Sequence, residues 1–247
     1  MAPLPQTVAL VTGGSGIVGA GVIYAFLKAG AQVIAPVRNE KGKGSLLGDL
    51  RDLDKPTLAH LEIPTADLSD PKSVAELGEM VKAKHGSLDH VVTSVGGWWQ
   101  KGPILQFANL ETSYDEMLTE YKARVLSHYM LAKVFVPFLK VDAASSFTFI
   151  TGSLGEAPVF PDASMITAQV GALMILIRTI QAELAEQPYR VNEFCIGTLV
   201  KRHGEADNNQ SGSATNRQIG LKVLETIEST GESGKIKVGA DDLPNVE

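Results

Sequence analysis

The segment Thr12-Gly13-Gly14-Ser15-Gly16-Ile17-Val18-Gly19 decides the fold of this chain. It follows a short apolar run at residues 8–11 and precedes apolar residues at helical spacing that end at Gly30. This pattern predicts a strand, a glycine-rich turn and a helix. A second strand predicted at residues 32–37 completes a βαβ unit of about 30 residues, the length that a right-handed crossover needs.

The rest of the chain continues the alternation. Further strands are predicted at residues 60–66, 88–95, 147–150, 191–196 and 235–238. Helices are predicted at residues 46–54, 71–85, 112–139, 164–185 and 219–227. This order indicates a Rossmann-type doubly wound parallel sheet, a three-layer α/β/α architecture in a single domain of residues 1–247. Residues 201–218 are polar and rich in Gly, Ser and Asn, so we expect either a mobile lid or disorder there.

Length and composition agree with one α/β domain. The 247 residues suffice for a parallel sheet covered on both faces, which needs about 200 to 250 residues. The chain is 44% hydrophobic but only 6% aromatic, as expected for an aliphatic core under helices rather than for a β-sandwich. The net charge of -6 argues against a nucleic-acid partner, because phosphate binding requires a concentrated basic surface.

Several features indicate a cytoplasmic protein. Cys195 is the only cysteine, so no internal disulfide can form. The longest apolar run, residues 170–177, is shorter than the roughly 20 residues that cross a bilayer, so we expect no membrane span. Residues 1–5 lack the basic and apolar regions of a signal peptide.

The glycine-rich turn is a candidate phosphate-binding site. Glycines allow the backbone to approach a pyrophosphate closely, and the amides and dipole at the N-terminus of the next helix stabilise the anion. We therefore assign cofactor contacts to Gly13, Ser15, Gly16, Ile17 and Gly19. The alternative is that the glycines serve only the tight packing of the strand against the helix.

The chain resembles the short-chain dehydrogenase/reductase family along nearly its whole length. The matching features are the spacing of Gly13, Gly16 and Gly19, the pair Asp67-Leu68, Pro137, the triplet Arg190-Val191-Asn192, and Gly197. The turn Thr93-Ser94-Val95-Gly96 occupies the place of the family's Asn-Asn-Ala-Gly turn, with only the glycine kept. The resemblance implies that Asp67 and Leu68 contact an adenine and that Ser94 and Gly96 line the cofactor site. Ile196 stands where the family has a proline, which is a departure near the nicotinamide.

Arg38, at the end of the second predicted strand, indicates which nicotinamide cofactor binds. In such folds an acidic residue there binds the ribose 2′-hydroxyl, whereas an arginine binds a 2′-phosphate. A guanidinium offers two parallel N–H groups to a phosphate, so we predict NADP(H) rather than NAD(H). The alternative is that Arg38 is a solvated charge at a strand end.

The catalytic positions implied by the resemblance depart from the family. The family's serine corresponds to Ser153, but its tyrosine and lysine fall on Ile166 and Val170, and a further asparagine falls on Arg124. Neither Ile166 nor Val170 can donate a proton or hold the nicotinamide ribose. Arg124 can hold an anion but cannot act as a general acid at neutral pH. We expect it on the solvent side of its helix, where the alternative role is an oligomer contact.

Two further features lie near these positions. Asp162 precedes the helix of residues 164–185, where it either anchors Arg124 or caps the helix. Trp98-Trp99 follows the fourth strand, and the pair either lines a pocket or fills core and interface. We assign Ser153, Arg124 and Asp162 to catalysis.

These residues indicate an atypical NADP(H)-dependent oxidoreductase that acts on a small organic substrate. Reduction of an iminium ion gives a neutral amine without an obligatory protonation, so such a substrate tolerates the loss of the tyrosine. Some short-chain-reductase-like enzymes of fungal alkaloid biosynthesis are similar in lacking both residues and in carrying an arginine on the same helix. The alternative is a non-redox protein on the same fold, either a sensor or an isomerase or cyclase. We expect no metal ion, and a homodimer or homotetramer that pairs the helices of residues 112–139 and 164–185.

Overall fold

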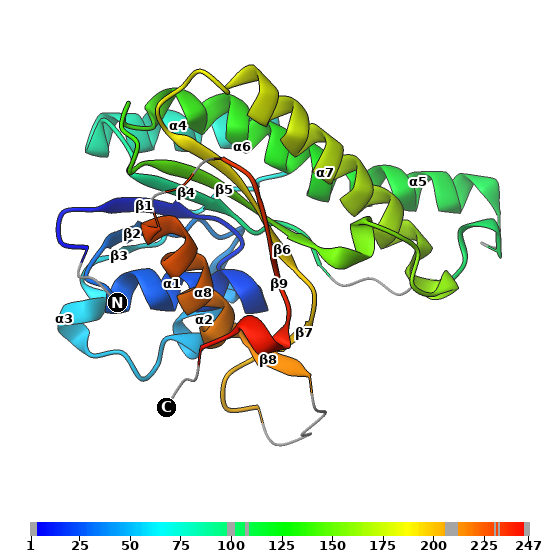
Figure 1. Cartoon of the computed structure of the whole chain (residues 1–247), viewed down its shortest axis with the longest axis horizontal. Helices are drawn as coiled ribbons and strands as arrows, with labels where there is room; N and C mark the ends of the chain where they lie inside the picture. The colour runs from blue at the N-terminus through cyan, green and yellow to red at the C-terminus, as the bar shows by residue number, and fades with distance from the viewer. Residues whose placement is uncertain are drawn as a thin grey trace.

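Parallel strands form the central sheet of the computed structural model, which describes residues 4–97, 102–106, 109–205, 212–229, 231 and 233–244. Their order is β3-β2-β1-β4-β5-β6-β9 (Figure 1). The strands are β1 (Val8–Val11), β2 (Gln32–Ile34), β3 (Leu61–Glu62), β4 (His90–Thr93), β5 (Ser146–Gly152), β6 (Arg190–Ile196) and β9 (Lys235–Val238). The order reverses between β1 and β4, so the carboxyl ends of these two strands flank the crevice where such sheets bind ligands. The Rossmann-type doubly wound sheet is confirmed.

Helices cover both faces of the sheet and complete the three layers (Figure 1). One face carries α1 (Ile17–Lys28), α2 (Glu40–Asp49), α3 (Lys55–Leu58) and α8 (Asn216–Glu228). The other carries α4 (Pro71–His85), α6 (Ser127–Phe135) and α7 (Ser164–Glu183), with α5 (Leu110–Tyr121) extending this layer beyond the sheet. Adjacent residues of β1 divide between the two cores: Ala9 and Val11 pack in one and Leu10 in the other. This two-sided burial explains why the strands are continuously apolar.

Local capping signals set the bounds of α4 and α2. Asp70 accepts hydrogen bonds from the amides of Lys72 and Ser73, and Pro71 occupies the first position of α4, as its sequence predicts. The helix expected at residues 46–54 instead begins earlier, as α2. Its cap is Asn39, whose side chain accepts a hydrogen bond from the Gly42 amide.

The helix expected at residues 112–139 is divided into parts. α5 ends at Tyr121, a π-helical turn spans Lys122–Leu126, and α6 continues from Ser127 to a 3-10 turn at Val136–Phe138. The Ser127 hydroxyl donates to the carbonyl of Lys122, five residues earlier. Because a π turn inserts a residue into the helix, it changes which side chains face the sheet, and such turns are frequent at functional sites.

The polar segment of residues 201–218 is described only at residues 201–205 and 212–218. Its described ends form a small parallel pair, β7 (Leu199–Lys201) with β8 (Ser213–Thr215). α8 begins directly after β8 with a capping box between Thr215 and Gln218. Motion of this segment as a lid stays a prediction.

Helix α7 and the turn before it, Pro161–Glu183, are long and apolar enough to cross a membrane by length and composition alone. The apolar run of residues 170–177 considered above is only part of this helix. Half of its most apolar window is buried in the fold, where Leu173 and Ile177 pack in the core. A buried core helix passes the same test, so the finding is weak support for a membrane span.

Candidate functional site

The glycine-rich turn lies against the carboxyl end of β4. Gly13 has a φ of +74°, and a Cβ there would lie 1.9 Å from the carbonyl oxygen of Ser94. The amide of Ser94 in turn donates to the hydroxyl of Thr12 (3.3 Å). A Cβ on Gly19 would lie 2.3 Å from the Gly13 carbonyl oxygen, so any side chain at either position would fill the turn. The turn therefore needs glycine both for its backbone angle and for its close packing.

The N-terminus of α1 is open to an anion. Gly16 is its N-cap, no side chain caps the helix, and no acidic residue lies in its first turn. Ser15 is exposed and Ile17 is half-buried at this end. Uncapped first-turn amides together with the helix dipole favour a phosphate group. The residues present thus fit the pyrophosphate of a dinucleotide cofactor, while the individual contacts assigned to the five positions stay predictions.

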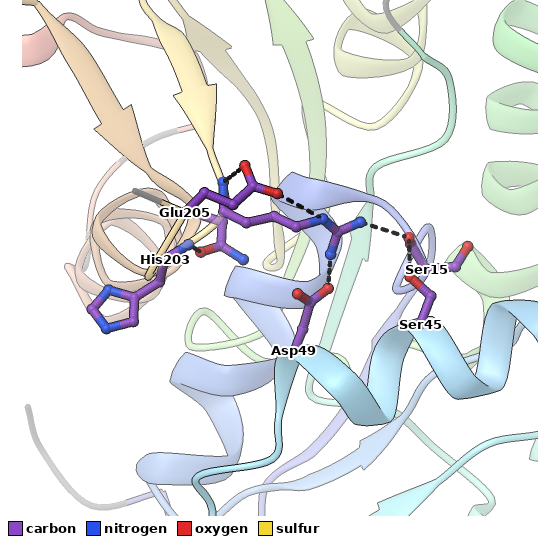
Figure 2. Close-up of polar contacts among 7 residues, drawn as sticks. Ser15, Ser45, Asp49, His203 and Glu205 are labelled. Carbon is purple, nitrogen blue, oxygen red and sulfur yellow. Dashed lines mark hydrogen bonds and ion pairs between the residues drawn. The ribbon is translucent and has the colours of Figure 1, made fainter. Parts of the chain in front are cut away.

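An arginine that the sequence analysis did not select contacts this turn at the carbonyl oxygen of Ser15, and Figure 2 shows Ser15 beside Ser45 and Asp49. Arg202, directly after β7, donates through Nη2 to the carbonyl oxygen of Ser15 (3.4 Å) and forms an ion pair with Asp49 of α2. The hydroxyl of Ser45 donates to the same carbonyl (3.3 Å), and Glu205 lies 3.9 Å from the Arg202 Nε. Arg202 therefore fastens the segment after β7 to both the glycine turn and α2. A lone arginine in a polar stretch carries no local signal of this contact.

Arg38 and Asp67, which the sequence analysis assigned separately, lie side by side beyond the ends of β2 and β3. Arg38 Nε is 3.6 Å from Asp67 Oδ1, and the two side chains are 67% and 42% exposed. The same carboxylate accepts hydrogen bonds from the hydroxyl (2.7 Å) and amide (3.0 Å) of Ser69. These bonds, and more weakly Arg38, hold the pKa of Asp67 below its usual value. Leu68 is half-buried against the core beside α4.

Arg124 is buried, which corrects the expectation that it lies on the solvent side of its helix. It belongs to the π turn and is only 7% exposed. Its Nε donates to Gln169 Oε1 of α7 (3.3 Å), and its Nη2 donates to the carbonyl oxygen of Gly97 (2.5 Å). Burial lowers the pKa of the guanidinium, and Glu120 has a weaker opposite effect. The expectation assumed a regular α-helix, and the inserted π turn changes which residues face inward. The predicted position of Arg124 was therefore wrong.

Gly96 makes room for this guanidinium. It has a φ of +141°, and a Cβ there would lie 2.6 Å from Arg124 Nη1. Gly96 and Gly97 are themselves exposed at the end of β4. Arg124 therefore lies directly beneath the backbone of the crevice edge. Gly96 thus packs against Arg124, and the cofactor contact that the resemblance implies for it stays a prediction.

Ser153 lies near the two apolar positions of α7. It opens a 3-10 turn, Ser153–Gly155, at the end of β5, and its side chain is half-buried. A Cβ on Gly155 would lie 2.6 Å from Val170 Cγ1, so this turn packs directly on α7. Ile166 and Val170 are 6% and 4% exposed and belong to an apolar cluster that includes Met174, Cys195 and the partly buried Leu154. No proton donor stands at either position.

The Ser153 turn is fastened to the edge of the sheet. Glu156 follows the turn, and its carboxylate accepts hydrogen bonds from Lys235 (2.8 Å) and Lys237 (2.5 Å) of β9. These two bonds lower the pKa of Glu156 to about 2. Lys235 also lies 3.5 Å from the buried carboxylate of Glu193. The position of Ser153 thus depends on charged residues far along the chain.

Among the described contacts, Asp162 neither anchors Arg124 nor caps the helix that follows it. It is exposed in the turn Pro161–Ala163, and α7 begins at Ser164 with Ala163 as its N-cap and no side-chain cap. The described partners of the Arg124 guanidinium are Gln169 and Gly97 instead. The physical reason is that burial of Arg124 directs its guanidinium toward α7 and the β4 end. The pair Trp98-Trp99 lies outside the described residues.

Sequence reasoning missed Gln169 and His128 as neighbours of Arg124. Gln169 is 4% exposed, and its Nε2 has no hydrogen-bond partner among the described residues. His128 is fully buried and donates through Nδ1 to the Arg124 carbonyl (2.5 Å). Burial lowers the pKa of His128 to about 4, so the ring is neutral near pH 7. A polar residue on an otherwise apolar helix face, as at Gln169, is the signal that could have found this group.

Comparisons with known proteins agree with this geometry. The model of a family described as enoyl-(acyl carrier protein) reductase matches residues 13–233. A 1-deoxy-11-beta-hydroxypentalenate dehydrogenase of Streptomyces avermitilis is 28% identical over 86% of this chain and 77% of its own length. A short chain aldehyde dehydrogenase 1 of Euphorbia lathyris is 28% identical over 98% of this chain and 80% of its own length.

Solved structures share the fold. A metagenomic short-chain oxidoreductase in complex with NADP has a TM-score of 0.75 at 21% identity, covering 95% of this chain and 97% of its own. An alcohol dehydrogenase from the archaeon Thermococcus sibiricus, complexed with 5-hydroxy-NADP, has a TM-score of 0.78 at 17% identity, covering 98% and 99%. The family match spans most of the chain, and the glycine turn stands at the switch point of the sheet. The chain therefore belongs to the enoyl-(acyl carrier protein) reductase family and is an oxidoreductase of the short-chain dehydrogenase/reductase type.

Proposed function

We propose that this protein is an atypical NADP(H)-dependent short-chain reductase whose small organic substrate needs no proton from a tyrosine. The observation that carries the proposal is the apolar packing of Ile166 and Val170 against the turn that holds Ser153. A site built in this way offers no acid where the family resemblance places one. Such a site suits hydride transfer to a substrate whose reduced product is neutral without a further proton.

The cofactor half of the proposal rests on the glycine turn and on Arg38. The uncapped N-terminus of α1 suits a pyrophosphate, and the exposed guanidinium of Arg38 suits a 2′-phosphate. Two structural neighbours were solved with NADP or 5-hydroxy-NADP, which supports the choice of cofactor. When bound, the cofactor supplies a hydride, and hydride addition to an iminium carbon gives an uncharged amine.

The protein's own contribution is to hold and orient the substrate. Ser153 supplies a hydroxyl at the end of β5, and Arg124 supplies a fixed positive charge beneath the end of β4. A preorganised charge in a water-poor site stabilises negative charge that is present or develops on the substrate. The neutral, buried His128 adds no second positive charge to Arg124.

Single-turnover oxidation of NADPH tests this function. We expect cyclic iminium compounds to be reduced and simple ketones to react far more slowly. Arg124→Ala should lower the rate about 100-fold or more, the size of a lost electrostatic contact in such a site. Ser153→Ala should lower it as well. Lys122→Ala is the matched control, because Lys122 is exposed on the same π turn and loses the same charge.

Folding must be checked by circular dichroism, because Arg124 is buried and its removal will cost stability. Arg124→Lys keeps the charge and serves as the second variant. Full activity in folded Arg124→Ala and Ser153→Ala would show that these are the wrong residues. If the protein binds NADPH tightly but oxidises it with no ketone, imine or enone tested, the non-redox alternative is favoured. A non-redox protein needs no acid at Ile166 and Val170, so the apolar residues there fit it equally well.

We also propose a homo-oligomer formed through the helical segment of residues 112–139, which comprises α5, the π turn and α6, and through α7. Large apolar side chains are exposed along the helical layer that contains them; they are Tyr114, Met117, Leu118, Tyr121, Leu126, Tyr129 and Ile175. Apolar residues on an outer helix face are typical of a symmetric interface. Sedimentation at micromolar concentration should detect a dimer or tetramer. A monomer would contradict the proposal.

A further inference from the structure

We propose that Arg124 and Gln169 form a receptor for a carboxylate group on the substrate. The inference rests on the proposed function, because it names the chemical class of molecule that the same site would accept. It comes from the burial and hydrogen bonding of these two side chains, which lie on separate helical segments, the π turn and α7.

The first observation is a buried cation without an acidic partner. Arg124 is 7% exposed, and the partners recorded for its guanidinium are the neutral groups Gln169 Oε1 and the Gly97 carbonyl. Within the part of the chain that the structure describes, no carboxylate lies at ion-pairing distance from it, and Glu120 acts only from farther away. A buried charge is costly unless an opposite charge compensates it. Arg190 is equally buried, at 6% exposed, and also lacks an acidic partner among the described residues, but four backbone carbonyls accept hydrogen bonds from its guanidinium, whereas two acceptors are described for Arg124.

The second observation is unused hydrogen-bonding capacity at the same place. A guanidinium has more N–H donors than the two bonds account for, and Nη1 faces Gly96 at the crevice edge. The Nε2 of Gln169 is buried and unpartnered in the described structure. Oε1 of the same amide group accepts from Arg124 Nε, so this free donor lies close to the guanidinium. Unmet donors on two adjacent buried groups point to an acceptor that the described residues do not supply.

The geometry favours a carboxylate over other acceptors. A single guanidinium offsets a single negative charge, and its planar N–H groups match a carboxylate in a two-point contact. A phosphate would bring further charge, and the neighbouring His128 is neutral. The phosphates of a cofactor already have a place at the glycine turn, on the other side of the β1–β4 switch point.

This receptor restricts the substrate further. A guanidinium repels a cationic C=N group, so an iminium ion alone would enter the site at a disadvantage. A carboxylate on the same molecule would reverse this, because it compensates Arg124 and leaves a substrate of zero net charge. The substrate class that fits is therefore a small imino compound that carries a carboxylate.

Thermal unfolding with simple probes tests the receptor without any turnover. The probes are sodium acetate and sodium benzoate, each compared with its uncharged amide, acetamide or benzamide, at ionic strength held constant with chloride. At about a hundredfold excess over its Kd, a carboxylate should raise Tm by roughly 5 to 10 °C. The amides should raise it far less. Equal shifts for benzoate and benzamide, and for acetate and acetamide, would overturn the inference.

Variants locate the effect. Arg124→Gln and Gln169→Leu should each lose most of the carboxylate-dependent shift, Arg124→Lys should keep part of it, and Lys122→Gln should keep all of it. Each variant is compared with itself in chloride, so a lower starting Tm does not obscure the result, and the probe series on the unmutated protein stands even if Arg124→Gln fails to fold. A shift retained in Gln169→Leu and in Arg124→Gln would overturn the assignment.

A further arm separates this site from the cofactor site. The carboxylate shift should persist when ADP-ribose is present at saturation, whereas its disappearance would mean that the probes occupy the pyrophosphate site and would overturn the receptor. If only the proposed function fails, carboxylates still stabilise the protein but no substrate is reduced with oxidation of NADPH. Oxidation of NADPH by uncharged imines with no carboxylate shift would instead uphold the function and remove the receptor.

Discussion

Replacing Gly13 by alanine should damage the fold at the point where the cofactor is proposed to bind. A Cβ at this position would lie 1.9 Å from the Ser94 carbonyl oxygen, and the residue has a φ of +74°. A side chain in the left-handed region costs about 1 to 2 kcal/mol, and forcing apart packed groups costs about 1 to 3 kcal/mol more. Gly13→Ala should therefore lower the free energy of unfolding by about 2 to 5 kcal/mol.

Gly30→Ala is the matched control for the backbone angle. Gly30 has a φ of +87°, but a Cβ there would meet no atom within 4 Å. Gly30→Ala should therefore lower the free energy of unfolding only by the cost of the left-handed backbone angle, about 1 to 2 kcal/mol. The difference between the two variants then measures the close approach of Gly13 to Ser94.

The assay is urea unfolding followed by circular dichroism, with the slope of the transition compared among the three proteins. NADPH titration under conditions where each protein is folded gives the second readout. Binding should weaken in Gly13→Ala and stay unchanged in Gly30→Ala. Equal destabilisation by both substitutions would refute the steric reasoning, and unchanged NADPH affinity in Gly13→Ala would refute the assignment of the turn.

Three other predictions concern charged groups. NADPH should bind more tightly than NADH, and Arg38→Asp should remove or reverse a preference of about 1 to 3 kcal/mol; equal affinities in the unmutated protein, measured by fluorescence titration, would exclude Arg38 as a phosphate ligand. Burial lowers the pKa of His90 and of His128 to about 4 in the folded chain, so the unfolded chain binds more protons between pH 6.5 and 4. The free energy of unfolding should be highest above pH 6.5 and should fall between pH 6.5 and 4 by on the order of 3 kcal/mol for each histidine. A free energy of unfolding that stays constant from pH 7 to 5 would contradict this prediction. A double-mutant cycle of Arg202→Gln and Asp49→Asn should give a coupling of about 0.5 to 3 kcal/mol in urea unfolding, whereas additive effects would mean that the ion pair does not fasten the segment.

The elements that the sequence predicted best are those governed by local signals. The turn of residues 12–19, the helix capped by Asp70 and the alternation of strands and helices all follow from spacings of a few residues. The prediction of one continuous helix at residues 112–139 was wrong for a local reason too, because its apolar pattern does not indicate the π turn at Lys122–Leu126. That single turn decides whether Arg124 faces solvent or the core.

Local sequence thus determined the fold class and the position of the glycine turn, because backbone angle, capping and periodicity act between near neighbours. Only the tertiary structure decided what surrounds that turn. Arg124 meets Gln169, 45 residues away, and Arg202 meets Ser15, 187 residues away, where a crossover and a returning segment bring them together. Such contacts depend on how layers pack, and a charged side chain carries no mark in the sequence of the partner that packing will give it.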